Sequence, residues 1–116
     1  MKIEGEAKLL RIFLGENDRI SHMPVYEKIV IEARKNNLAG ATVYKGIMGF
    51  GGNSRIHSAK ILRLSEDLPL VVEIVDEQKK IEDFIPIVEN IFDDANCGGL
   101  ITMEKADIIK YTSNKK

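Results

Sequence analysis

The sequence predicts an α+β protein in which a sheet of four antiparallel strands carries two helices on one face. The expected elements follow the order strand, helix, strand, strand, helix, strand along the 116 residues. The two halves also share a local pattern, since each helix precedes a glycine that leads into a strand with an early threonine, in Gly40-Ala41-Thr42-Val43 and in Gly99-Leu100-Ile101-Thr102. A repeated strand–helix–strand unit of this kind favours a two-layer sandwich.

The first half of the chain supplies a strand, a polar connection and a helix. Residues 8–15 carry apolar side chains on both faces of a predicted strand, with Arg11 on one of them. A helix is expected from about residue 24 to residue 37, because Pro24 suits the first helical position, where its missing N–H costs nothing. Four apolar side chains recur at helical spacing and form its predicted buried stripe: Tyr26, Ile29, Val30 and Ala33.

Three further strands and a second helix are expected after residue 40. The second strand leads into a polar loop at about residues 51–60 and a hairpin return through residues 61–64. The third strand covers residues 70–75, and the second helix covers residues 78–94, with a kink near residue 82 caused by Pro86. The last strand spans residues 100–103, with a further extended piece at about residues 108–111.

The second strand ends in a cluster of glycines that no strand requires. Gly46, Gly49, Gly51 and Gly52 give up side-chain packing and cost backbone entropy, so they need a physical reason. One reason is a bulge or hinge at the mouth of a mobile loop, and the other is a close approach of main-chain N–H groups to a ligand. The pair Gly98-Gly99 after the second helix favours the ligand interpretation, while a helix C-cap is the alternative for that pair.

Composition indicates a single domain with one core. Hydrophobic residues make up 44% of the sequence, and 17 basic against 18 acidic residues leave a net charge of −1, which gives no bulk attraction for nucleic acid. The longest apolar run is too short to cross a bilayer and no signal peptide is visible, so we expect a cytoplasmic protein without membrane insertion. The domain is predicted to have its core at residues 8–111 and a loose tail at residues 112–116.

Residues with obvious chemistry are sparse. Cys97 is the only cysteine and the two histidines, His22 and His57, lie far apart, so no metal site is expected. No Ser–His–Asp, Cys–His or paired-carboxylate pattern predicts catalysis. The second face of the sheet would expose apolar side chains in a monomer, which favours a homo-oligomer, and we expect a trimer.

Three stretches of the sequence resemble a known family. Residues 40–46, the turn Gly49-Phe50-Gly51 and His57 resemble the second strand and following loop of PII signalling proteins. The similarity is greater to a PII-like family grouped as a domain of unknown function, in which a Gly-Ala-Thr-Val strand, a Gly-Phe-Gly turn and a Leu-Pro-Leu-Val-Val-Glu strand ending in Asp recur. The resemblance covers about residues 8–111. It implies a ferredoxin-like βαββαβ fold, a trimer, adenine nucleotides in the clefts between subunits, and a partner-binding loop after the second strand.

The resemblance implies a nucleotide site in three parts. Thr42 corresponds to a threonine near the adenine, residues 49–53 to a loop base near the phosphates, and residues 96–99 to a glycine loop that holds phosphates. Arg55 is the best cation for a phosphate, and its alternative is a solvated loop residue. A solvated residue is slightly favoured for His57, and a small packed thiol is the commoner outcome for Cys97. The implied binding residues are Thr42, Gly49, Phe50, Gly51, Gly52, Asn53, Arg55, His57, Asn96, Cys97, Gly98 and Gly99.

Departures from the PII pattern indicate which nucleotide to expect. The Thr-Gly and Gly-Asp-Gly-Lys patterns are absent, and no lysine lies between Lys80 and Lys105. Because a triphosphate needs several cationic donors, AMP or ADP is expected in preference to ATP.

The resemblance implies a non-enzymatic regulator that requires no cofactor and signals to a partner protein, with a membrane transporter among the candidates. The alternative from another class is a ligand-free trimeric scaffold or tolerance-type protein that acts only by protein contact. A phosphohydrolase is the third and weakest hypothesis, because residues 15–19 are too acidic to cradle a phosphate.

Overall fold

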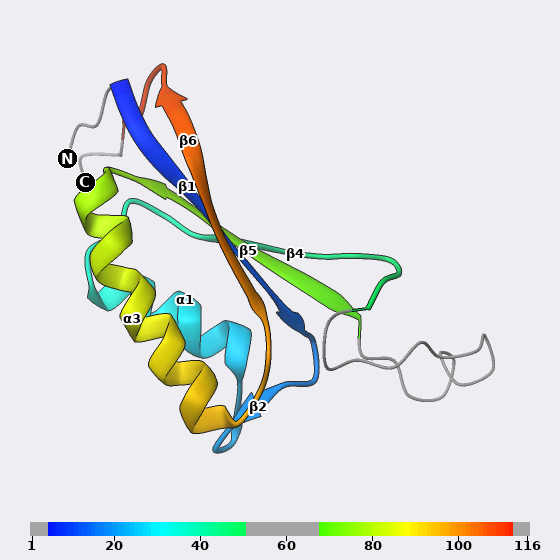
Figure 1. Ribbon diagram of the computed structural model, residues 1–116. Coiled ribbons are helices and arrows are strands. Elements are labelled where there is room, and N and C mark those ends of the chain that lie inside the picture. The colour runs from blue at the N-terminus through cyan, green and yellow to red at the C-terminus, as the bar shows by residue number, and fades with distance from the viewer. Residues whose placement is uncertain (1–4, 51–67, 113–116) are drawn as a thin grey trace.

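A four-stranded antiparallel sheet carries both helices on one face in the computed structural model, which describes residues 5–50 and 68–112 (Figure 1). The strand order is β4-β5-β1-β6, so β5 and β1 occupy the centre. The main elements are β1 (Gly5–Gly15), α1 (Val25–Lys35), β4 (Thr42–Lys45), β5 (Pro69–Asp76), α3 (Gln78–Ala95) and β6 (Leu100–Ile108). The predicted α+β sandwich is confirmed, and its strand order and connections are those of a ferredoxin-like βαββαβ fold.

The two faces of the sheet differ in burial because side chains alternate along each strand. Leu10 and Ile12 of β1 are completely buried, and they pair with Ile74 and Val72 of β5, which are also buried under the helices. The alternate residues of these two central strands point to the opposite face, where most of them are only half-buried. The core therefore lies between the sheet and the helices, and neither α1 nor α3 covers the second face, which we call the uncovered face.

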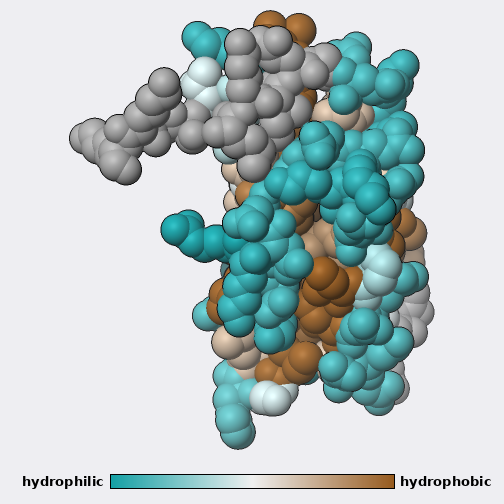
Figure 2. Space-filling model, turned by 90° about the vertical axis from the view of Figure 1, so that its left-hand side faces the viewer, coloured by the Kyte–Doolittle hydropathy of each residue, from teal (hydrophilic) through white to brown (hydrophobic). Residues whose placement is uncertain are grey.

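Each helix buries one stripe of side chains. In α1 the stripe consists of Val25, Ile29 and Ala33, with Tyr26 and Val30 packed at its edge, much as the spacing predicts. In α3 the buried residues are Ile81, Phe84, Val88, Ile91 and Phe92. On the helical side of the molecule, hydrophilic side chains cover most of the surface and hydrophobic ones show between them (Figure 2).

Several features of the fold differ from the sequence prediction. Pro24 lies outside α1 as its N-cap, with an extended ψ of 141°, so the helix begins at Val25. The connection expected to be a loop contains two short paired strands, β2 (Arg19–Ile20) and β3 (Met23–Pro24). The last strand was expected to stop at residue 103, which is wrong: β6 continues to residue 108, because β1 begins at residue 5 and pairs with it along that whole length.

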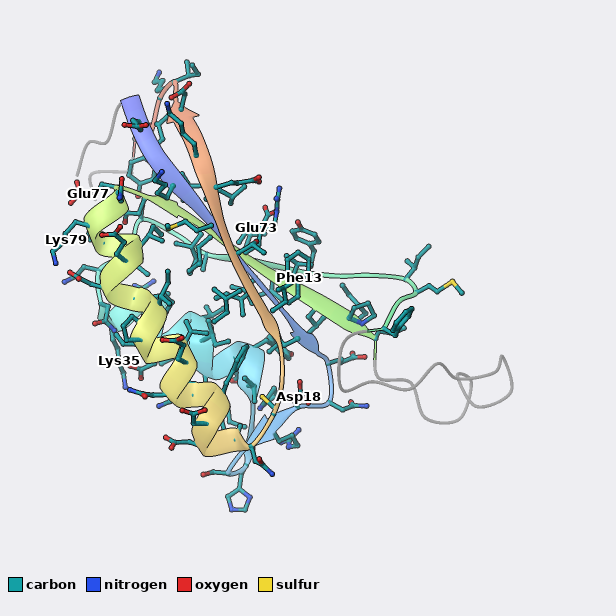
Figure 3. All side chains as sticks on the ribbon, viewed as in Figure 1. Phe13, Asp18, Lys35, Glu73, Glu77 and Lys79 are labelled. Carbon is teal, nitrogen blue, oxygen red and sulfur yellow. The ribbon has the colours of Figure 1, made fainter. Side chains whose placement is uncertain are left out.

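A row of hydrogen-bonded polar side chains crosses the uncovered face of the sheet. Tyr44 Oη donates to Glu73 Oε2 at 2.5 Å, and Arg11 Nε donates to the same oxygen at 2.8 Å. Arg11 Nη1 also donates to Glu104 Oε1 at 2.5 Å, so this polar row touches all four strands. Figure 3 shows Glu73 and Phe13 on the side of the sheet away from the helices. The hydrogen bonds from Tyr44 and then Arg11 lower the pKa of Glu73.

Apolar side chains flank the polar row. Phe13 and Val71 lie half-buried on this face, and Leu100 and Val75 are 56% and 36% exposed in the single chain. Exposed apolar side chains on one sheet face are typical of a surface that another protein covers. This is the face for which the sequence predicted a partner subunit.

Candidate functional site

Two glycine-containing segments lie at the same end of the sheet but at its opposite edges. Lys45, at the end of β4, pairs with Leu70 of β5, which in turn pairs with Leu14 near the end of β1. The first residue of β6, Leu100, pairs with Phe13 of β1. The end of β4 and the start of β6 therefore lie at the same end of the sheet. Three strand spacings of about 4.8 Å separate β4 from β6, so the segments after β4 and before β6 are on the order of 14 Å apart. Within one chain, the described residues of these two segments are therefore not brought together into one site.

The glycines that end β4 have a packing reason. A Cβ on Gly46 would lie 2.9 Å from Pro69 Cγ, and one on Gly49 would lie 3.1 Å from the same atom. The Gly46 N–H also donates to Pro69 O at 2.7 Å, which extends the pairing of β4 with β5. For these two residues, the close approach that excludes a side chain is to Pro69.

The remaining predicted residues of this segment are exposed or lie outside the described part of the chain. Thr42 is exposed on the uncovered face, opposite Glu73 in the sheet register. Phe50 is 66% exposed, and Ile47 and Met48 beside it are 95% and 77% exposed. Ile47, expected to continue the inward face of the strand, thus lies beyond it. The predicted residues outside the described ranges are Gly51, Gly52, Asn53, Arg55 and His57.

The segment before β6 forms the C-terminal cap of α3. Asn96 adopts the left-handed conformation, with φ 52° and ψ 45°. The backbone N–H groups of Asn96 and Cys97 donate to carbonyl oxygens in the last turn of α3, both at 3.1 Å. Those two donors are therefore used within the helix cap. Among residues 96–99, Gly98 and Gly99 are left as the candidates to offer backbone N–H groups to a ligand.

Gly99 is needed because two chain segments approach it closely. A Cβ at this position would lie 2.6 Å from Phe92 Cε2 and 2.7 Å from Phe13 O. The second of these atoms belongs to the backbone of β1, which cannot move without disturbing the sheet. Packing between α3 and β1 thus accounts for Gly99 but not for Gly40 in the first half of the chain, where an added Cβ would meet nothing within 4 Å.

Cys97 behaves as a packing residue. It is half-buried and contacts the hydrophobic core. Burial, followed by the nearby Asp18 carboxylate, raises the pKa of its thiol. The thiol is therefore protonated at neutral pH and a poor nucleophile.

An open pocket of about 590 Å³ lies between the end of α3 and the start of β6. Its lining combines the predicted Cys97, Gly98 and Gly99 with two carboxylates that the sequence reasoning missed, Glu89 and Asp93. The signal for them was present, since they stand four residues apart near the end of a helix whose last turn has no basic residue. The remaining lining residues are Asn90, Phe92 and Ile101.

A buried aspartate fixes the chain just before β4. Asp76 is 0% exposed, and its carboxylate accepts hydrogen bonds from the N–H of Ala39 at 2.9 Å and from the N–H of Glu77 at 2.7 Å. Tyr111 Oη donates to Ala39 O at 2.8 Å, and Lys80 Nζ lies 3.7 Å from Asp76. These contacts hold Ala39, three residues before Thr42, so the chain is fixed shortly before β4 begins.

Several cations of the described ranges already have carboxylate partners. Lys45, at the end of β4, lies 2.6 Å from Glu16, and Lys105 lies 3.1 Å from Glu6. Arg11 lies between two glutamates of the polar row. A phosphate near these residues would have to compete with existing ion pairs. Within residues 5–50 and 68–112, no group of three or more His, Cys, Asp or Glu residues could hold a metal ion, and no helix is long and apolar enough to cross a membrane.

The fold is similar to that of solved PII-like proteins. Its structure is similar to that of the CPII protein of Thiomonas intermedia, a nitrogen regulatory PII-like protein bound to ADP, AMP and bicarbonate, with a TM-score of 0.65 and 12% identity over 89% of this chain and 88% of that one. A putative PII-like signaling protein from Thermus thermophilus gives a TM-score of 0.61 and 15% identity, over 90% and 91% of the two chains.

The sequence defines the family more narrowly. The family model DUF190, "Uncharacterized ACR, COG1993", matches residues 7–108, and the chain belongs to this family. A UPF0166 protein of Aquifex aeolicus is 40% identical over 102 residues, which cover 88% of this chain and 92% of that protein. A UPF0166 protein of Methanocaldococcus jannaschii is 32% identical over 105 residues, which cover 90% and 94%. Membership of a family of unknown function, expected from the sequence, is confirmed by this match, and the expected PII-like fold is confirmed by the structural similarity.

Proposed function

We propose that the protein is a PII-like regulator that binds an adenine nucleotide, AMP or ADP in preference to ATP, without turning it over. The fold supports this proposal, because a PII-like protein of the same architecture has been seen with ADP and AMP bound. The observation that carries it is the position of the two segments around residues 46–50 and 96–99 at one end of the sheet. The preference for fewer phosphates is supported by Lys45, a cation at the end of β4 that is already paired with Glu16.

The proposed nucleotide site lies between subunits of a homotrimer. The two segments occupy opposite edges of one sheet, so they meet only if the edge of one subunit faces the opposite edge of the next. The uncovered face, with Leu100 and the polar row, is the proposed contact between subunits. The proposed ligand-binding residues remain Thr42, Gly49, Phe50, Gly51, Gly52, Asn53, Arg55, His57, Asn96, Cys97, Gly98 and Gly99.

Signalling to a partner protein is proposed to use the surface after β4. Ile47, Met48 and Phe50 are mostly exposed apolar side chains next to one another in the chain. Such side chains are costly to leave in water and are typical of contact surfaces. The proposed partner is unidentified, and a membrane transporter remains among the candidates.

Isothermal titration calorimetry tests the nucleotide proposal directly. The full-length protein is titrated with AMP, ADP, ATP and, as a control for the base, GMP. We expect binding of AMP and ADP at micromolar to millimolar concentration, weaker binding of ATP, and no phosphate release over hours. If no adenine nucleotide gives a binding signal at millimolar concentration, the nucleotide proposal is refuted and the ligand-free scaffold becomes the better proposal.

Leu100→Glu tests the proposed subunit contact. This side chain is 56% exposed in the single chain, so a charge there is tolerated by the fold but not by an apolar interface. We expect the wild type to have the mass of a trimer in light scattering and the variant to have the mass of a monomer, with an unchanged circular dichroism spectrum. A variant that stays trimeric would show that the uncovered face is not the contact.

A further inference from the structure

We infer that Glu89 and Asp93, in the pocket beside Gly98 and Gly99, set the preference of the proposed nucleotide site by penalising each additional phosphate. The inference rests on the proposed function and gives it a specificity determinant. It differs from the phosphate-holding role expected for residues 96–99, because carboxylates repel phosphates.

The geometry places both carboxylates on one side of the pocket. Glu89 and Asp93 are four residues apart on α3, one helical turn, so they lie on the same face of the helix. Both are exposed, and both line the pocket together with the two glycines. The described lining contains no lysine or arginine to offset their charge.

The surroundings of the pocket are also negative. The C-terminal end of a helix carries about half a negative charge, and α3 has no basic residue in its last turn. The cap uses the N–H groups of Asn96 and Cys97, so these two backbone donors already have acceptors within the helix and do not offset the negative charge. A third carboxylate, that of Asp18, is close enough to act on the Cys97 thiol.

A ligand with few charges fits this environment better than a polyphosphate. Glu89 and Asp93 can accept hydrogen bonds from ribose hydroxyls or from the exocyclic amine of adenine. AMP carries about two negative charges at neutral pH and ATP about four. For charges roughly one Debye length apart, about 8 Å at physiological salt, two extra phosphate charges facing two carboxylates reduce affinity about three- to fivefold.

The test compares the ratio of the ATP and AMP dissociation constants in three full-length proteins. These are the wild type, the double variant Glu89→Gln with Asp93→Asn, and the control Glu82→Gln. Both amides keep the shape of the carboxylates they replace. Glu82 is exposed on the same helix but about 10 Å along its axis from Glu89, outside the pocket. Calorimetry is run with a chelator, since a divalent cation would mask the phosphate charge.

We expect the ATP to AMP ratio to fall three- to fivefold in the double variant, more at 20 mM than at 300 mM salt, and to stay at the wild-type value in Glu82→Gln. An unchanged ratio in the double variant, or an equal change in the control, would overturn the inference while leaving the nucleotide proposal intact. Absence of binding by the wild type would overturn both, so the two failures are distinguishable.

Discussion

Replacing Gly99 with alanine measures how tightly α3 is packed on the sheet. The added Cβ would lie 2.6 and 2.7 Å from two atoms of the Phe92 ring and 2.7 Å from Phe13 O. Carbon atoms in contact prefer about 3.5–4.0 Å, so the carbon–carbon overlap is about 0.8 Å or more. Phe92 is only 9% exposed, so its ring has little room to move away.

Overpacking of this kind costs about 1–3 kcal/mol, and we expect Gly99→Ala to fall at the upper end, at about 2–3 kcal/mol. For a chain of this length, that loss lowers Tm by roughly 6–15 °C. The assay is urea unfolding at one fixed protein concentration, because the stability of an oligomer depends on concentration. The matched control is Gly40→Ala, since a Cβ at Gly40 would meet nothing within 4 Å. Equal unfolding midpoints for the two variants would refute the packing explanation of Gly99.

Two further predictions concern carboxylates. Asp76→Ala removes the acceptor of the half-buried N–H groups of Ala39 and Glu77, and should cost about 2–4 kcal/mol in urea unfolding, with a smaller loss for Asp76→Asn. Equal losses in the two variants would contradict the role of the acceptor. The pKa of Glu73 is lowered by Tyr44 and Arg11, so its stabilising effect is complete above the unfolded value of about 4.5 and is lost as the pH falls through the folded value. The stability difference between wild type and Glu73→Gln should therefore shrink between pH 6 and pH 3, and parallel pH profiles would contradict this.

The strands and helices of this fold could be predicted because local patterns and tertiary contacts agree. The stripe at Ile29 and Ala33 and the buried run of β5 both follow from the spacing of apolar residues. The length of β6 could not be predicted, because its second half has the exposed, charged sequence of an edge strand and is held by pairing with β1. Pairing with β1, which is distant in the sequence, is a tertiary effect. The local sequence of residues 104–108 therefore gives little indication that they form a strand.

The candidate site could be predicted only as a set of segments. The position of Gly98-Gly99 before the last strand was readable from the sequence, but the reason for Gly99 was not, since Phe92 and Phe13 O approach it from two other elements. The sequence shows that Glu89 and Asp93 are acidic and one helical turn apart. It does not show that they line the same pocket as Gly98 and Gly99, because that depends on how α3 packs against the start of β6. The polar row needed the register of all four strands to become visible.

The pairing of Gly5 with Ile108 has a practical consequence for handling the protein. This pair marks the end of the sheet opposite to the one where β4 ends and β6 begins. A tether or fluorescent label joined beyond either residue therefore starts from the far end of the domain. Protein immobilised through such a tether would present the ends of β4 and α3 to the solution. The proposed nucleotide site would then stay accessible in titrations by surface plasmon resonance or biolayer interferometry.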